Sequence, residues 1–489
     1  MSEHPSPSRR RFLAQSAQIA LGSAAAWATM GQLQLVQAAT RPQPDDFRAM
    51  VCIYLFGGND SFNMLVPRTA SAYTQYQAAR PALSIPQASL LPLNALSGTG
   101  GVDWGLHPAM AEMQALFNGG QAALLANVGP LVAPTTKATY QNRSVPLPPE
   151  LFSHVDQQAY SLSMGSETAA KTGWGARIAD RLGDYGLVSG EGLPASISLS
   201  GSNMWQAGAG QGIYTMGSTG PSRINDTLRD STWTRTIPRR EAFYKLLDSA
   251  QRDASVFTRE HARTSRRAIE FSEFAYNAIN SAPAITTAFP TPSSNRLSDP
   301  LRTVARTIAA RQALGQKRQV FFVGLGGWDT HDNLIVDHER LLGTLSAAMA
   351  AFYRATVELG VSEQVTTFTL SDFGRTLNNN GDGSDHGWGG HSWMLGGDVV
   401  GRKIYGQVAE MRLGSDLDVG RGRMIPTTAI EQLGSTMARW FGLRYGDAME
   451  IFPNLRNFGT GADYLPMLAS SNRLLNEVDF DRRLIGGGK

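Results

Sequence analysis

Three short apolar segments, each followed at once by acidic or histidine residues, constrain the fold of this chain more than any other feature. The segments are AMVCIYLF (49–56), QVFFVGL (319–325) and VTTFTL (365–370), and they continue as GGND, GGWDTHDN and SDFGRT. Short runs of this composition predict strands that are buried on both faces of a sheet. The polar residues then lie just past the C-terminal strand ends, where open α/β sheets bind ligands: Asp60, Asp329, His331 and Asp372.

Helical segments separate these predicted strands. Apolar residues recur at helical spacing in residues 107–120, 299–315, 338–360 and 427–442. The alternation of helix and strand predicts an α/β fold with parallel strands and crossover helices. We expect residues 40–489 to form one domain with a long insertion near 185–300, which ends in a Pro/Ser/Thr-rich linker or surface loop.

The first 39 residues have the form of a twin-arginine export signal. SRRRFL (8–13) precedes an apolar stretch, and VQAA (36–39) fits a cleavage site. The apolar stretch is short and rich in Ala, Gly and Ser, so it would span a bilayer poorly. We therefore expect a periplasmic or secreted protein that uses the twin-arginine translocase as its partner during export and has no stable membrane anchor after cleavage.

Charge and cysteine content exclude two further classes. The 44 basic and 41 acidic residues give a formal charge of only +3, which is too balanced for a nucleic-acid-binding surface. Cys52 is the single cysteine, so an intramolecular disulfide is impossible. Its apolar surroundings predict a place in the core rather than a reactive role.

Histidines and carboxylates gather in the glycine-rich loops. Carboxylate oxygens with imidazole nitrogens bind Zn²⁺ and, with more oxygen ligands, Mn²⁺, Mg²⁺ or Ca²⁺. We predict a divalent-metal site whose candidate ligands are Asp60, Asp329, His331, Asp372, Asp385, His386 and His391. The alternative for any single aspartate is a helix cap or an Asx turn. His261 and His338 are expected to be solvated instead.

Four further residues are candidates for catalysis. Ser153 and Asp156 have the form of a capping box, so Ser153 is expected to be the N-cap of a helix that starts at His154. A helix N-terminus also stabilises anions, and Ser153 could instead be a nucleophile beside a metal. His154 and His107 could orient a substrate. Arg375 could bind a substrate oxyanion or pair with a neighbouring carboxylate.

At these motifs the chain closely resembles a family of exported bacterial proteins described as domain of unknown function 1501. The motifs cover most of the chain after the signal and occur in the family's order: LFGGNDSFNMLVP, LHPAM, SHVDQQ, GWGAR, GGWDTHDN, SDFGRT, DHGWGGHSWMLGG and VGRKIYG. The family is similar to the alkaline phosphatase and sulfatase superfamily, whose members hold one or two divalent metals at the C-terminal edge of an α/β/α sheet. The resemblance implies a three-layer, alkaline-phosphatase-like fold.

The resemblance also implies roles for individual residues. Asp60, Asp372 and the pair Asp329 and His331 would be metal ligands, His386 or His391 would be the final histidine, and Ser153 would lie near the nucleophile position. Phe373 stands where a two-metal phosphatase has its second histidine, so the number of ions stays open. The chain contains no CxPxR or SxPxR sulfatase signature.

These implications lead to two functional expectations. The first is a metal-dependent hydrolase of phosphate or sulfate esters, with a small-molecule or polymeric substrate. The second is a non-catalytic envelope protein that keeps the fold and uses its loops for structure or for binding.

Overall fold

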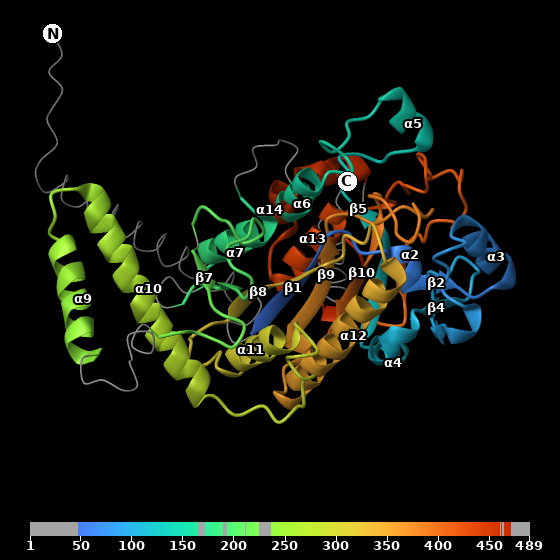
Figure 1. The fold of residues 1–489 in the computed structure, drawn as a ribbon. Helices are drawn as coiled ribbons and strands as arrows, with labels where there is room; N and C mark the ends of the chain where they lie inside the picture. The colour runs from blue at the N-terminus through green and yellow to red at the C-terminus, as the bar shows by residue number, and fades with distance from the viewer. Residues whose placement is uncertain are drawn as a thin grey trace, which may run out of the picture. The chain divides into compact units, whose positions relative to one another are not determined.

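The predicted strands lie at the centre of a mixed β-sheet in an α/β fold (Figure 1). The computed structural model describes residues 47–164, 172–188, 193–210, 212–223, 236–459, 461 and 464–470, so the predicted signal at 1–39 lies outside the described residues. Within them, the central sheet has nine strands in the order β11-β5-β10-β9-β1-β8-β6-β7, with β12 paired to β5. Its strands are β1 (Arg48–Phe56), β5 (Ala122–Gly129), β6 (Ser196–Ser198), β7 (Ile213–Thr215), β8 (Arg318–Gly326), β9 (Val365–Ser371), β10 (Gly390–Leu395), β11 (Ile404–Gly406) and β12 (Thr428–Ala429).

The three segments predicted from sequence are β1, β8 and β9, and they are neighbours. β1 pairs with β8 on one side and with β9 on the other, both in parallel. Within the described part of the central sheet, only β10 runs antiparallel to its neighbours, β5 and β9. The three C-terminal ends therefore meet at one edge of the sheet, as the sequence predicts.

Helices cover both faces of the sheet. Alternate side chains of β1 accordingly enter two different hydrophobic clusters. Val51 and Ile53 pack in a cluster with residues of α11 and α12, whereas Cys52 and Tyr54 pack in a cluster with residues of α7 and α13. Figure 1 shows α11 and α12 together along one side of the sheet. The predicted three-layer α/β/α fold with a mostly parallel sheet is confirmed, and so is the core position of Cys52.

The helices that precede and follow the central strands agree with the predicted segments. The α-helices are α2 (Ser61–Met64), α3 (Ala70–Ala79), α4 (Ala111–Asn118), α5 (Lys137–Asn142), α6 (His154–Ser163), α7 (Trp174–Asp184), α9 (Thr236–Ala250), α10 (Val256–Ser281), α11 (Ser298–Ala309), α12 (Leu334–Glu358), α13 (Ile430–Phe441) and α14 (Tyr445–Ile451). Short 3₁₀ helices lie at Gln87–Ser89, Pro108–Met110, Ser362–Gln364 and Pro453–Phe458. A small antiparallel sheet contains β2 (Leu65–Pro67), β3 (Leu91–Pro92) and β4 (Trp104–Leu106).

Two sequence-based expectations are modified by the fold. Residues 185–300 contribute β6 and β7 to the central sheet, so this segment is only partly an insertion; α9 and α10, which pack on each other, belong to its remainder. The expectation that His338 is solvated is wrong, because this residue of α12 is completely buried and its Nε2 lies 3.0 Å from Oδ1 of Asn59, in the loop after β1. His261 is exposed, as expected.

A helix that crosses a bilayer needs about 20 consecutive, mostly apolar residues. In the part of the chain that the structure describes, every helix is too short or too polar to do so.

Candidate metal centre

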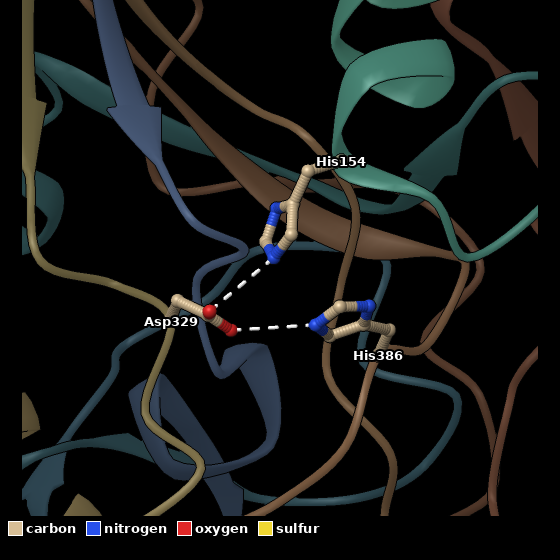
Figure 2. Close-up of side chains that lie close together, drawn as sticks. All are labelled: His154, Asp329 and His386. Carbon is tan, nitrogen blue, oxygen red and sulfur yellow. Dashed lines mark ion pairs between the residues drawn. The ribbon is translucent and has the colours of Figure 1, made fainter.

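Three side chains from distant segments converge beyond the sheet edge (Figure 2). Asp329 follows β8, His386 lies in the loop before β10, and His154 is the first residue of α6. Asp329 Oδ2 lies 3.4 Å from His154 Nε2, and Asp329 Oδ1 lies 3.4 Å from His386 Nε2. One ligand-type atom from each residue falls within 4.8 Å of the other two, so the described residues contain a group with the spacing of a metal site.

The proton of His154 is fixed by a buried carboxylate. His154 Nδ1 lies 2.7 Å from Asp372 Oδ2, which also accepts the backbone N–H of Gly57 at 3.1 Å. Burial raises the pKa of Asp372 above its usual value, while the hydrogen bond from His154 opposes that rise. In the neutral imidazole, the contact with this carboxylate places the proton on Nδ1 and leaves the lone pair on Nε2. That lone pair faces Asp329.

His386 has the same orientation for a different reason. Its Nδ1 donates to the backbone carbonyl of Phe152 at 2.7 Å, which leaves a lone pair on Nε2. Phe152 has a φ of 74°, an uncommon value for a residue with a side chain, and this conformation accompanies the contact between its carbonyl and the ring. Burial lowers the pKa of His386, so the ring is neutral at neutral pH.

These contacts test whether a cation fits. His154 Nε2 is buried and has no hydrogen-bond partner among the described residues, although a carboxylate oxygen lies 3.4 Å away. Two acceptors that face each other without a proton repel, whereas a cation between them would be attracted to both. A histidine that donates its other ring nitrogen to a carboxylate or a carbonyl is the usual arrangement around a metal ligand. The residues therefore fit a divalent ion.

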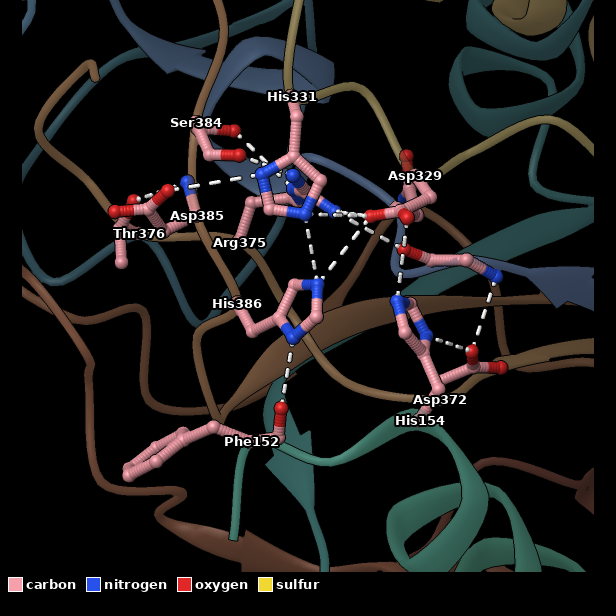
Figure 3. A network of polar contacts seen from close by, with 12 residues as sticks. Phe152, His154, Asp329, His331, Asp372, Arg375, Thr376, Ser384, Asp385 and His386 are labelled. Carbon is pink, nitrogen blue, oxygen red and sulfur yellow. Dashed lines mark hydrogen bonds and ion pairs between the residues drawn. The ribbon is translucent and has the colours of Figure 1, made fainter.

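His331 and Asp385 flank this group, as Figure 3 shows. His331 Nε2 lies 2.9 Å from His386 Nε2 and 3.1 Å from Asp329 Oδ1, while its Nδ1 lies 3.6 Å from Asp385 Oδ1. His386 Nε2 carries no proton, so His331 Nε2 donates to its lone pair. A cation bound to His386 would replace this hydrogen bond, and His331 Nε2 could then donate to Asp329 Oδ1. His331 is 40% exposed at its side chain, so its ring can exchange protons with solvent.

The guanidinium of Arg375 makes its hydrogen bonds to groups of the protein. Its Nη1 donates to Asp329 Oδ1 at 2.6 Å and to the carbonyl of Gly57 at 3.2 Å, and its Nε donates to Ser384 Oγ at 3.2 Å. The side chain is fully buried. Burial alone would raise the pKa of Asp329, but Arg375 lowers it below its ordinary value, helped by His331 and His154. Of the two alternatives from sequence, the structure shows the carboxylate pair.

The other predicted ligands are placed elsewhere. Asp60 is buried in an ion pair with Arg80, at 2.9 Å, rather than beside Asp329. Asp372 lies behind His154 instead of pointing its bonded oxygen into the centre. His391 accepts the backbone N–H of Asn127 on its Nδ1 at 3.0 Å, so its Nε2 carries the proton and offers no lone pair.

A small cavity connects two of these residues. It has a volume of about 20 Å³ and is lined by Asp372, His391 and Ser61 among others. This is room for about one water molecule. Asp372 Oδ1 and His391 Nε2 both belong to residues that line the cavity and have no hydrogen-bond partner among the described residues, so one water could join this acceptor to this donor.

Of the predicted catalytic residues, His154 belongs to the converging group, whereas Ser153 and His107 do not. Ser153 is the N-cap residue of α6, but its hydroxyl donates to Asp156 Oδ2 at 2.7 Å and makes no capping bond to the backbone. His107 is buried, accepts from the backbone N–H of Ala109, and has its pKa lowered to about 4 by burial. His154, expected only to orient a substrate, is instead one of the three converging side chains.

Sequence reasoning missed three contributors to this site. Phe152 acts through its backbone carbonyl, which no side-chain pattern reveals. Arg421 and Arg423 contact Asp385 and the backbone of His386. The sequence signal for these two is Gly-Arg-Gly-Arg at 420–423, whose glycines indicate a tight turn.

Comparisons with known proteins identify the family. The crystal structure of Ps i-CgsB in complex with k-i-k-neocarrahexaose is 10% identical, with a TM-score of 0.30, over 84% of this chain and 77% of that chain. The crystal structure of PsFucS1 sulfatase from Pseudoalteromonas sp. is 9% identical, with a TM-score of 0.30, over 84% of this chain and 70% of that chain. No curated protein matches the chain. The model of one family matches residues 48–452, from the first residue of β1 across every residue of the metal centre, and this chain therefore belongs to the family described as protein of unknown function (DUF1501).

Proposed function

We propose that this protein is a metal-dependent hydrolase of sulfate or phosphate esters. The observation that carries the proposal is the convergence of two imidazole lone pairs, from His154 and His386, on the carboxylate of Asp329. The position of this group, past the C-terminal ends of parallel strands, is the usual ligand-binding edge of such sheets. The resemblance of the motifs to the phosphatase and sulfatase superfamily supports ester hydrolysis as the reaction class.

The ligand set favours a zinc-type ion. Two nitrogens and one carboxylate oxygen suit Zn²⁺, whereas Mg²⁺ and Ca²⁺ prefer sites made of oxygen atoms. Three protein ligands also leave a position open for a substrate. A bound ion would act as a Lewis acid on the ester oxygens.

The remaining steps fall to side chains near the ion. His331 is partly exposed and is backed by Asp385, so it is the group placed to transfer a proton between the reacting molecules and solvent. Ser153 is not among the three converging side chains, and its hydroxyl donates to Asp156. We propose a water molecule as the attacking group. Arg375 keeps Asp329 ionised and in place.

A second function, metal binding without catalysis, has one observation in its favour. The ring of Phe373 packs 4.8 Å from the ring of His154 and 4.7 Å from that of His386. This apolar ring fills space beside the centre that a phosphatase would give to another ligand. In that case the ion would stabilise the loops, and the protein would act in the envelope as a binding or structural component.

We further propose that the protein works outside the cytoplasm. The proposal rests on the twin-arginine motif at residues 8–13. The partner in export would be the twin-arginine translocase.

The test compares three variants for metal content and for hydrolysis of 4-nitrophenyl sulfate and 4-nitrophenyl phosphate. His386→Ala should lose the metal and the activity, because it removes a ligand. His331→Gln should keep the metal and lose activity by about 10²-fold or more, as expected for removal of a proton-transfer group. His261→Ala, an exposed histidine on α10, is the control and should change neither.

The outcomes separate the two functions. Metal in the wild type with no cleavage of either ester would support the binding or structural role. A wild type that stays metal-free after incubation with Zn²⁺ would rule out both.

A further inference from the structure

A turn held by Asp418 carries two arginines, Arg421 and Arg423, which contact residues of the candidate metal centre. The carboxylate of Asp418 accepts the backbone N–H groups of Gly420 at 2.7 Å and Gly422 at 2.8 Å through Oδ1, and that of Gly414 at 2.8 Å through Oδ2. Gly420, Arg421 and Gly422 have φ values of 124°, 62° and 76°. A left-handed conformation is unfavourable for an arginine and persists only where the surroundings enforce it. Strain of this kind is concentrated at functional sites.

The two arginines contact consecutive residues of the centre. Arg421 Nη2 lies 2.6 Å from Asp385 Oδ2, the carboxylate behind His331. Arg423 Nε donates to the backbone carbonyl of His386 at 3.1 Å. The guanidinium of Arg423 also lies 4.4 Å from the centre of the Phe152 ring. Phe152 is the residue whose carbonyl orients His386. Arg423 therefore contacts both partners of the hydrogen bond between Phe152 and His386.

Arg423 differs from the other arginines around the centre in its pairing. Arg375 and Arg421 each bond a carboxylate. Arg423 bonds no carboxylate among the described residues, and there its Nη1 and Nη2 groups have no hydrogen-bond or ion-pair partner. The side chain is half-buried, so part of its hydration has already been removed. An arginine held through Nε and ring stacking presents its two Nη groups as a preformed fork for an oxyanion.

We propose that Arg423 binds the sulfate or phosphate group of the substrate, and this inference rests on the proposed function. The charge requirement follows from the pairing: among the described residues, no carboxylate pairs with the guanidinium of Arg423, which lies next to the His386 backbone. The substrate class is therefore an ester that keeps negatively charged, non-bridging oxygens. Neutral carboxylic esters would gain nothing from Arg423.

Anion titration tests the proposal directly. Inorganic sulfate and inorganic phosphate are titrated separately by calorimetry into zinc-loaded and zinc-free protein. Arg423→Gln should weaken binding of the preferred anion about tenfold or more in both forms, because one charge-assisted, two-bond contact is lost. Arg423→Lys keeps the charge without the fork and should lose less. Arg412→Gln is the matched control, since Arg412 lies on the same loop, is exposed and pairs with Glu410.

The possible failures can be told apart. If the wild type binds no zinc, the proposed function fails, while the zinc-free titration still tests Arg423. Arg423 has only a structural role if Arg423→Gln binds both anions as the wild type does. The same conclusion follows if Arg412→Gln loses as much affinity as Arg423→Gln. Equal melting temperatures of Arg423→Gln, Arg423→Lys and wild type exclude unfolding as the cause of a loss. No binding by the wild type at millimolar anion would also overturn the proposal.

Discussion

The hydrogen-bond partner of Nδ1 decides what four histidines of this protein can do: His107, His154, His386 and His391. His154 and His386 donate from Nδ1 and so offer Nε2 as a ligand, whereas His107 and His391 accept at Nδ1 and keep a proton on Nε2. Two of these histidines can therefore offer Nε2 to a cation, and the other two cannot. At this scale the most informative residue is Asp372, because it sets the state of His154 without lying in the centre itself.

Asp372→Asn should weaken zinc binding without abolishing it. The asparagine oxygen can still accept from His154 Nδ1, but the negative charge that makes the imidazole a better ligand is lost. A loss of about 10- to 100-fold in zinc affinity is expected for a partner of this kind, measured by competition with a chromophoric chelator. Affinity equal to that of the wild type would show that Asp372 does not support the site.

Among the structural elements, the loop after β1 controls the position of Asp329. Gly57 has a φ of 119°, and a Cβ added there would lie 2.3 Å from the backbone nitrogen of Asp329. The next residue is equally tight, since a Cβ on Gly58 would lie 2.6 Å from the Phe373 ring. Two glycines therefore let the ends of β1, β8 and β9 approach closely enough to share one site.

Gly57→Ala should displace Asp329 and abolish metal binding. The matched control is Gly120→Ala, because Gly120 has a φ of 90° but a Cβ added there would meet nothing within 4 Å. The control carries the backbone strain alone, about 1 kcal/mol, and should bind zinc as the wild type does. Elemental mass spectrometry together with chemical denaturation separates the two effects, and equal metal content in both variants would contradict this view of the loop.

The strands and the site edge could be predicted from sequence, but the ligand set only in part. The apolar runs before Asp329 and Asp372 identify β8 and β9, because short buried strands need continuous apolar residues. Asp60 follows its strand in the same way, yet it pairs with Arg80, the C-cap residue of α3. Ring tautomers and contacts to backbone carbonyls depend on tertiary neighbours, so sequence alone could not assign them.

Across the whole molecule, several imidazoles are buried in the uncharged state. Burial lowers the pKa of His107 and of His391 to about 4, and lowers that of His338 well below its ordinary value. At these histidines the folded protein therefore binds fewer protons than the unfolded protein between about pH 6.5, the ordinary pKa of histidine, and about pH 4. Their contribution to the free energy of unfolding falls as the pH falls through this window, whereas buried Glu431, whose pKa is raised to about 7, acts in the opposite direction.

His391→Asn should make the stability less dependent on acid. The asparagine oxygen can accept the Asn127 N–H but takes up no proton. Between pH 7 and pH 5 the variant should lose about 2 kcal/mol less unfolding free energy than the wild type, measured by chemical denaturation. His261→Asn changes an exposed histidine and should keep the wild-type slope; a His391→Asn slope equal to wild type would contradict the burial argument.

The candidate metal centre also has a consequence for how the chain folds. Phe152 and His386 are 234 positions apart, and Asp329 comes from a third segment between them, so the centre exists only when β1, β8, β9 and α6 are all in place. A partly folded chain cannot present the three ligand atoms at once. Uptake of the ion would therefore indicate that folding is complete. A chain in which one of these segments is out of place would bind no ion at this site.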